Sequence, residues 1–193
     1  MRIEERSYEV YEYVELNDDA KQKAFEKVSE MIIDDRFEWL KADLEDELNY
    51  KWKIDDAEVF YSLSYSQGDG LHFITSDLLT TPVVEEVKKH LTEADASLFD
   101  MLLPDASCYT KHDNNFYEYA SKYDVRCEWC DEDEYDADAI SRIEKAIESV
   151  YLSICNRLEK IGYDCYDVND EDVIDYCLVC EIEFFKSGLI FNL

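Results

Sequence analysis

The sequence has little glycine and proline and no long apolar run. Only four glycines and two prolines occur among 193 residues, a composition that argues against flexible linkers and low-complexity segments. No apolar stretch approaches the roughly 20 residues that a membrane-spanning helix needs. The first residues, MRIEER, are charged and lead into no apolar segment. We therefore expect no secretory signal there, and a cytoplasmic location.

Basic side chains are also scarce. Lys and Arg number 19 against 48 Asp and Glu, which gives a formal net charge of −29. The hydrophobic fraction is 47% and the aromatic fraction 14%, whereas disordered acidic segments contain few residues of either kind. The composition therefore predicts a folded protein with an anionic surface. Because nucleic-acid backbones and anionic membranes repel such a surface, we expect cationic partners, and no direct binding of nucleic acid or membranes.

Hydrophobic spacing predicts an α+β fold, in which antiparallel β-hairpins form a sheet packed against long amphipathic helices. We expect one domain over residues 1–193, with residues 131–138 as an acidic insert. The helices are expected at 18–50 with a break near Asp34 and Asp35, from Pro82, from Thr92, at 138–161 up to Gly162, and at 170–177. The strands are expected at 7–16, 58–65, 71–75, 106–112, 116–128, 181–185 and 189–191.

Three acidic clusters concentrate the charge. A helix dipole favours acidic residues at its N-terminus, but this explains only one or two of the six carboxylates in residues 131–138. Duplex DNA presents about one negative charge per 1.7 Å of axis, so dense carboxylates on a folded protein can compete for a Lys- and Arg-lined cleft. The alternative is a solvated face, which charge runs usually form. The residues that we expect to contact a partner are Asp43, Glu45, Asp46, Glu47, Asp131, Glu132, Asp133, Glu134, Asp136, Asp138, Asp170, Glu171 and Asp172.

The acidic clusters do not have the spacing of a dedicated calcium loop. An EF-hand loop needs Gly at its sixth position and Glu at its twelfth. Counting from Asp131 places Asp136 and Arg142 at these positions, and residues 167–178 fail in the same way. We therefore expect no calcium site in either segment.

Seven cysteines include two Cys-x-x-Cys pairs, Cys127 with Cys130 and Cys177 with Cys180. Zinc sites of four cysteines commonly place about 15–20 residues between the pairs, whereas 46 intervene here. The acidic residues beside the first pair would raise a thiol pKa, which disfavours redox catalysis. We expect small buried reduced thiols and no cofactor. A zinc site formed by these four cysteines, or a metal-dependent or redox enzyme, is the alternative.

Residues 66–70, SQGDG, invite comparison with phosphate-binding loops. They lack the lysine and the glycine spacing that such loops need, and they suit a hairpin turn with positive φ. The alternative is an exposed recognition loop presenting Gln67 and Asp69. The scattered histidines, His72, His90 and His112, single out no catalytic combination, and we expect no enzymatic activity.

An N-terminal Tyr-x-Val-Tyr-x-Tyr segment is followed in order by residues 15–24, 61–70, 111–117, 169–174 and 181–188. Together these segments resemble a family of small acidic proteins encoded by phages and prophages. The family has no securely known activity, although some members are labelled antitoxin-like. We hypothesise a relationship to anti-CRISPR proteins that inhibit Cas9, for which no motif in this sequence is diagnostic. The cysteines and residues 131–138 depart from the family pattern.

The resemblance implies a phage or mobile-element origin. Combined with the charge, it predicts a non-enzymatic inhibitor of a host nucleic-acid-binding defence protein. Our leading hypothesis is anti-CRISPR inhibition of Cas9, with its guide RNA, by an acidic DNA-mimicking surface. The alternative is an antitoxin-like or other protein-binding module that neutralises a basic partner. The sequence leaves a homodimer open.

Overall fold

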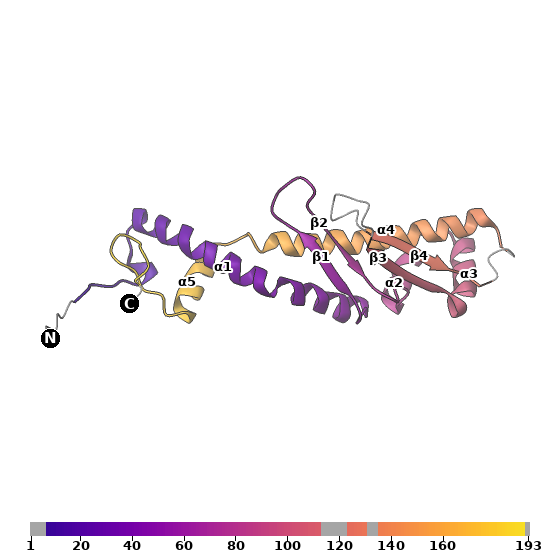
Figure 1. The fold of residues 1–193 in the computed structure, drawn as a ribbon, viewed down its shortest axis with the longest axis horizontal. Coiled ribbons are helices and arrows are strands. Elements are labelled where there is room, and N and C mark those ends of the chain that lie inside the picture. Colours follow the sequence, from indigo (N-terminus) through magenta and orange to yellow (C-terminus); the bar gives the residue numbers. More distant parts are fainter. Residues whose placement is uncertain (1–6, 113–122, 131–134, 192–193) are drawn as a thin grey trace. The chain divides into compact units, whose positions relative to one another are not determined.

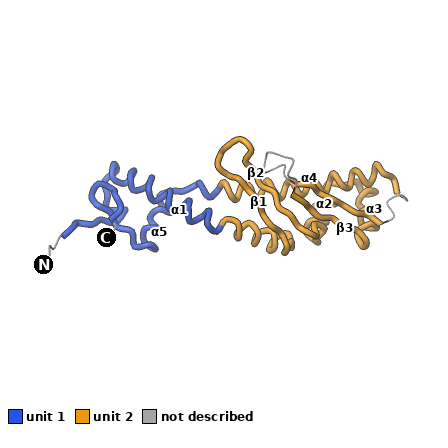
Figure 2. The backbone as a smooth tube through the Cα atoms, in the orientation of Figure 1, with its two compact units in different colours: residues 1–39, 164–193 blue, residues 40–163 orange. Residues whose placement is uncertain are grey.

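The computed structural model describes residues 7–112, 123–130 and 135–191 and shows an α+β fold (Figure 1). The chain divides into two compact units (Figure 2). Unit 1 comprises Met1–Trp39 with Asp164–Leu193, and unit 2 comprises Leu40–Tyr163. Helix α1 (Asp18–Glu47) contributes residues to both units. The expectation of one domain over residues 1–193 stays a prediction.

Unit 1 is built on the apolar stripe of the first part of α1. Helix α5 (Asp170–Val179) packs on this stripe through Val173 and Cys177, and the ring of Phe184 completes the core. The stripe repeats every fourth residue, which keeps its side chains on one face of a helix; its buried members are Ala20, Ala24, Val28 and Ile32. Asn17 caps α1, because its Oδ1 accepts the Ala20 N–H at 3.0 Å.

The strand expected at residues 7–16 is wrong. Tyr11 and Phe184 form a single antiparallel bridge, and the short 3₁₀ helix η1 (Tyr13–Glu15) follows at once. Tyr13 and Leu16 are both buried, and a spacing of three suits a helical turn, whereas a half-buried strand buries every second residue. The two C-terminal strands likewise reduce to one bridge, between Phe184 and Ile190. Gly188 allows the turn there, with φ of +85°.

Helix α1 runs without interruption through Asp34 and Asp35, so the expected break is wrong. Both residues are exposed, and Tyr176 on α5 donates a hydrogen bond from its hydroxyl to Asp35 Oδ2 at 2.6 Å. Two adjacent acids therefore lie on the solvent side of a continuous helix, where they interrupt the apolar pattern but not the backbone. The helix ends in a single π-helical turn, η2 (Leu48–Trp52).

Unit 2 contains both expected antiparallel strand pairs, and the first hairpin is confirmed. Of the second hairpin, residues 113–122, which include the expected start of its second strand at 116, lie outside the described residues. Strand β1 (Glu58–Ser62) pairs with β2 (Gly70–Ile74), and β3 (Ser107–His112) pairs with β4 (Tyr123–Glu128), each antiparallel. They form two two-stranded sheets. Thr110 joins them: its N–H donates to the Thr75 carbonyl oxygen at 3.0 Å, and its hydroxyl donates to the Phe73 carbonyl oxygen at 3.1 Å.

Helix α4 (Ala137–Asp164) packs on these hairpins. The buried Tyr151 hydroxyl accepts the Phe73 N–H at 3.2 Å and donates to the Phe73 carbonyl oxygen at 2.8 Å. Its ring also lies 4.8 Å from that of Tyr123 on β4. The helix does not stop at Gly162 as expected, because that residue faces the core: a Cβ atom there would lie 2.2 Å from Leu63 Cδ1.

The remaining helices of unit 2 begin where the sequence indicates. Pro82 lies in the first turn of α2 (Thr81–Lys88), where its missing N–H costs nothing. Thr92 caps α3 (Glu93–Leu102) by accepting the Asp95 N–H at 3.2 Å. Helix α3 continues into the short 3₁₀ helix η3 (Leu103–Asp105) before β3 begins.

Candidate functional site

The acidic cluster at the end of α1 separates into two kinds of carboxylate. Glu45 accepts the Val59 N–H at 3.3 Å and pairs with Lys41, while Glu47 pairs with Arg157 at 3.0 Å. These two side chains are therefore engaged within unit 2. The positions of the acidic residues on a helix face do not show which carboxylates pair within the fold and which stay exposed.

Asp43 and Asp46 are exposed and have no ion pair or hydrogen bond to any residue that the structure describes. They lie three positions apart, which places them on one face of α1. A surface hollow of about 570 Å³ lies beside them, lined also by Tyr50 and Lys53. Tyr50 is 82% exposed, and the Lys53 Nζ lies 5.4 Å from its ring centre. This corner of unit 2 therefore offers two outward carboxylates and an exposed aromatic ring.

The acidic run at 131–138 is described only in part, and Asp131, Glu132, Asp133 and Glu134 lie outside the described residues. Asp136 caps α4: its carbonyl oxygen accepts the Ile140 N–H at 3.1 Å, and its Oδ1 accepts the Asp138 N–H at 3.2 Å. Asp138 is exposed in the first turn, where the helix dipole favours an anion. Both residues therefore have a role in starting α4, and the Asp138 carboxylate points outward.

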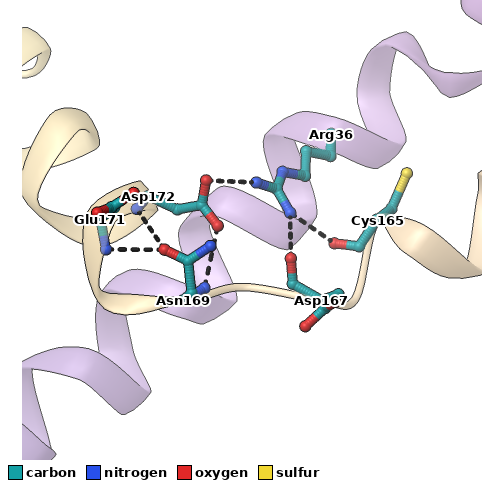
Figure 3. Close-up of polar contacts among 6 residues, drawn as sticks. All are labelled: Arg36, Cys165, Asp167, Asn169, Glu171 and Asp172. Carbon is teal, nitrogen blue, oxygen red and sulfur yellow. Dashed lines mark hydrogen bonds and ion pairs between the residues drawn. The ribbon is translucent and has the colours of Figure 1, made fainter.

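The cluster at the start of α5 is largely used by the fold of unit 1. Asn169 and Asp172 form a capping box: Asn169 Oδ1 accepts the Asp172 N–H at 3.1 Å, and Asp172 Oδ2 accepts the Asn169 N–H at 3.0 Å (Figure 3). Asp170 Oδ1 accepts the Tyr13 hydroxyl at 2.8 Å. Of Asp170, Glu171 and Asp172, only Glu171 has no side-chain hydrogen bond or ion pair to the described residues; it is exposed, and its backbone N–H donates to Asn169 Oδ1 at 2.8 Å.

Both units are acidic. Unit 1 has 20 acidic against 7 basic side chains, a net charge of −13, and unit 2 has 28 against 12, a net charge of −16. Moreover, nine Lys and Arg side chains within the described residues already form ion pairs with carboxylates of the same chain. With 48 Asp and Glu against 19 Lys and Arg in the whole sequence, the chain has too few cations to neutralise its carboxylates.

The 66–70 turn is anchored by Asp69. Its carboxylate accepts the N–H groups of Ser64 at 2.7 Å and Ser66 at 2.8 Å, and the Ser62 hydroxyl at 2.8 Å. Burial opposes ionisation, but these donors outweigh it and hold the pKa of Asp69 well below its usual range. Asp69 is thus a structural residue of the turn, while Gln67 is exposed. The positive φ expected in this turn is confirmed, with φ of +93° at Gly68 and +152° at Gly70, where β2 begins.

The two Cys-x-x-Cys pairs lie in different units, Cys127 and Cys130 in unit 2 and Cys177 and Cys180 in unit 1. Among the residues that the structure describes, no group of three or more His, Cys, Asp or Glu side chains could hold a metal ion. Cys127 stands opposite Cys108 across the β3–β4 ladder, and burial raises the pKa of the Cys177 thiol to about 11.

Unit 1 has an apolar surface that was not predicted from the sequence. Val14, Ile174, Leu178 and Val179 are all exposed, although Val173 and Cys177 on the same helix are buried. Helix α5 is therefore apolar on two sides. The sequence DEDVIDYCLV of α5 contains the signal, because Ile174 and Leu178 are four residues apart and lie on a second stripe.

Comparison with protein-family models, with curated protein sequences and with solved structures found no match. Within the described ranges, none of the helices combines the length and the apolar character needed to cross a membrane.

Proposed function

We propose that this protein is a binding inhibitor whose acidic surface occupies the Lys- and Arg-lined nucleic-acid cleft of a basic partner protein. One observation supports it above the others: Asp43, Asp46 and Glu171 direct carboxylates outward from a folded framework, while many of the cations are engaged within the chain. Exposed anions on each folded unit attract a basic cleft electrostatically and raise the rate of encounter.

The identity of the partner is proposed from the resemblance of the sequence to small acidic phage and prophage proteins, through the hypothesised relationship of that family to anti-CRISPR proteins. A guide-loaded Cas9 has the required chemistry, because it holds a heteroduplex in a positively charged channel. The acidic surface would exclude target DNA from such a channel. The phage or prophage origin belongs to the same proposal.

The test is competition for target DNA. Guide-loaded Cas9 is mixed with a fluorescent target duplex, and the purified protein is titrated while anisotropy is recorded. We expect the protein to displace the duplex, and the inhibitory concentration to rise steeply between 50 and roughly 300 mM salt, because salt screens exposed charges. No displacement at any salt concentration would contradict the proposal for this partner.

A matched pair of variants tests the surface. Asp43→Asn with Asp46→Asn removes two outward carboxylates, and we expect it to raise the inhibitory concentration about three- to tenfold, since each exposed pair contributes roughly 0.2–1 kcal/mol. Asp55→Asn with Asp105→Asn removes the same charge from other exposed positions of unit 2. Equal inhibition by both double variants would show that this corner of α1 is not the contact surface.

A second candidate is an antitoxin-like module that neutralises one basic protein, and the exposed apolar side chains of α5 favour it. A fixed apolar contact selects one partner, whereas carboxylates alone are attracted to many basic clefts. Co-purification from cells separates the two candidates, because an antitoxin would retain a single toxin in the absence of nucleic acid.

A further inference from the structure

A groove of about 710 Å³ lies on unit 1 between η1 and α5. Its apolar lining comes from Val14, Ile174, Leu178 and Ile182, and the buried Cys177 lies beneath them. Leu178 is 76% exposed and Val14 is 51% exposed. Single exposed apolar residues are normal on a protein surface, but several gathered in one hollow mark an interaction site.

Carboxylates border this apolar groove. Glu12, Glu181 and Glu183 line it together with the apolar residues, and Glu171 and Asp175 are further exposed carboxylates on the same helix α5. Among the described residues that line the groove, none is basic. The groove therefore offers an apolar centre and an anionic border, which is the complement of an apolar side chain flanked by Lys or Arg.

The backbone at Glu181 supports a role for its carboxylate. Glu181 follows the end of α5 with φ of +52°, and the Ile182 N–H donates to the Cys177 carbonyl oxygen at 2.8 Å. This helix ending normally uses glycine, because a side chain strains the left-handed conformation. A glutamate in this position keeps a carboxylate at the border of the groove in spite of the strain.

We propose that this groove binds a basic amphipathic helix of a partner protein. Apolar side chains three or four positions apart would enter between Val14 and Leu178, in the helix-in-groove mode. Flanking Lys and Arg would pair with Glu181 and Glu183. Helix α5 has 10 residues, about 15 Å of helix, which matches roughly three turns of a bound helix. A second copy of the chain is a poorer occupant, because it brings another −29 of charge.

This inference rests on the proposed function only in that both require a basic partner. The probe is a synthetic 14-residue peptide of leucine and lysine whose leucines fall on one helical face. A peptide of the same composition, with an order that gives no apolar face, is the control. Calorimetry should show that the amphipathic peptide binds at least about tenfold more tightly than the control, because burial of one or two leucine side chains lowers the free energy of binding enough for such a difference.

Variants locate the contact. Leu178→Gln should weaken binding of the amphipathic peptide about tenfold, and Glu181→Gln with Glu183→Gln should weaken it and flatten its salt dependence. The matched control is Met101→Gln, a change at a methionine that is 65% exposed on α3 of unit 2; it should bind like the wild type. In methyl NMR spectra, the signals of Val14, Ile174 and Leu178 should shift on titration.

Three outcomes would overturn the inference. Equal binding of both peptides, with Leu178→Gln unchanged, would make the surface a general anion patch. Methyl shifts confined to unit 2 would place the contact elsewhere. A dimer in sedimentation that Leu178→Gln dissociates would assign the groove to a second copy. The DNA competition assay with the Asp43 and Asp46 variants tests a surface on unit 2, whereas the peptide experiments test the groove on unit 1. Either proposal can therefore fail while the other is supported.

Discussion

The guanidinium of Arg36 on α1 lies 3.2 Å from the carboxylate of Asp172 on α5, measured from Nη2 to Oδ1 (Figure 3). The same guanidinium donates from Nη1 to the carbonyl oxygen of Asp167 at 2.8 Å. One cation thus ties the loop before α5, and its first turn, to α1 within unit 1. Because Asp172 also completes the capping box with Asn169, a carboxylate that the sequence assigns to a partner surface belongs to the framework of the unit.

Asp172→Asn should therefore destabilise the protein. The change weakens the capping box and removes the ion pair, and we expect a loss of about 1 kcal/mol in the free energy of unfolding, because the pair is roughly one-third exposed and partly screened. Urea unfolding followed by circular dichroism measures it. Glu171→Gln is the matched control and should stay within about 0.5 kcal/mol of the wild type. An equal loss in both variants would show that the helix dipole, and not these contacts, is responsible.

Gly188→Ala should be more damaging. A Cβ atom at residue 188 would lie 2.2 Å from the carbonyl oxygen of Ala20, a backbone atom, and φ there is +85°. We expect a loss of about 2–3 kcal/mol from the steric clash and the backbone strain together. Ser187→Ala, at the exposed neighbouring position, should unfold at nearly the wild-type urea concentration. A wild-type midpoint for Gly188→Ala would mean that this turn does not pack on α1.

The hydrogen bonds of Asp69 predict that the stability of the fold depends on its ionisation only at acidic pH. Its folded-state pKa lies below the unfolded value, about 3.9 for an aspartate. Its stabilising effect is therefore complete above pH 4 and is lost as the pH falls further toward the folded-state pKa. The stability difference between the wild type and Asp69→Asn should be constant from pH 7 to 5 and shrink below pH 4. A difference that persists unchanged at pH 2 would contradict the role assigned to the carboxylate.

Glu181→Gly should separate stability from binding. Glycine removes the strain of the left-handed conformation, and we expect up to about 1 kcal/mol of added stability, measured by thermal unfolding. Glu181→Gln keeps the strain and removes only the charge, so its unfolding should match the wild type. Both variants should bind the amphipathic peptide equally weakly. Wild-type affinity in both would exclude Glu181 from the contact.

Thiol labelling should follow burial. Cys130 and Cys180 are exposed, whereas Cys155 and Cys177 are buried. Burial raises the pKa of the Cys155 thiol to about 12 and that of Cys177 to about 11. Iodoacetamide at pH 8, with mass spectrometry of peptides, should modify Cys130 and Cys180 first and leave the buried pair protected until urea is added. Rapid labelling of Cys177 in the folded protein would contradict the packing of α5.

The elements that the sequence predicts well are those with strong local signals. Thr92 starts a helix because its side-chain oxygen can accept an N–H three residues later. The β1–β2 hairpin follows from alternating residues around glycines. The strand expected at 7–16 failed, because Tyr13 is held by Phe184 and Asp170, which lie far away in the sequence.

For the acidic surface too, some properties follow from the sequence and others only from the tertiary structure. Composition alone determines that the protein is strongly anionic, because the net charge is a property of the chain in any conformation, and the hydrophobic fraction predicts that it folds. Which carboxylates face a partner depends on tertiary structure, since Glu47 and Asp172 are engaged by arginines more than 100 positions away. The groove beside Leu178 arises for the same reason: only the packing of Val173 and Cys177 on α1 decides which stripe of α5 remains exposed.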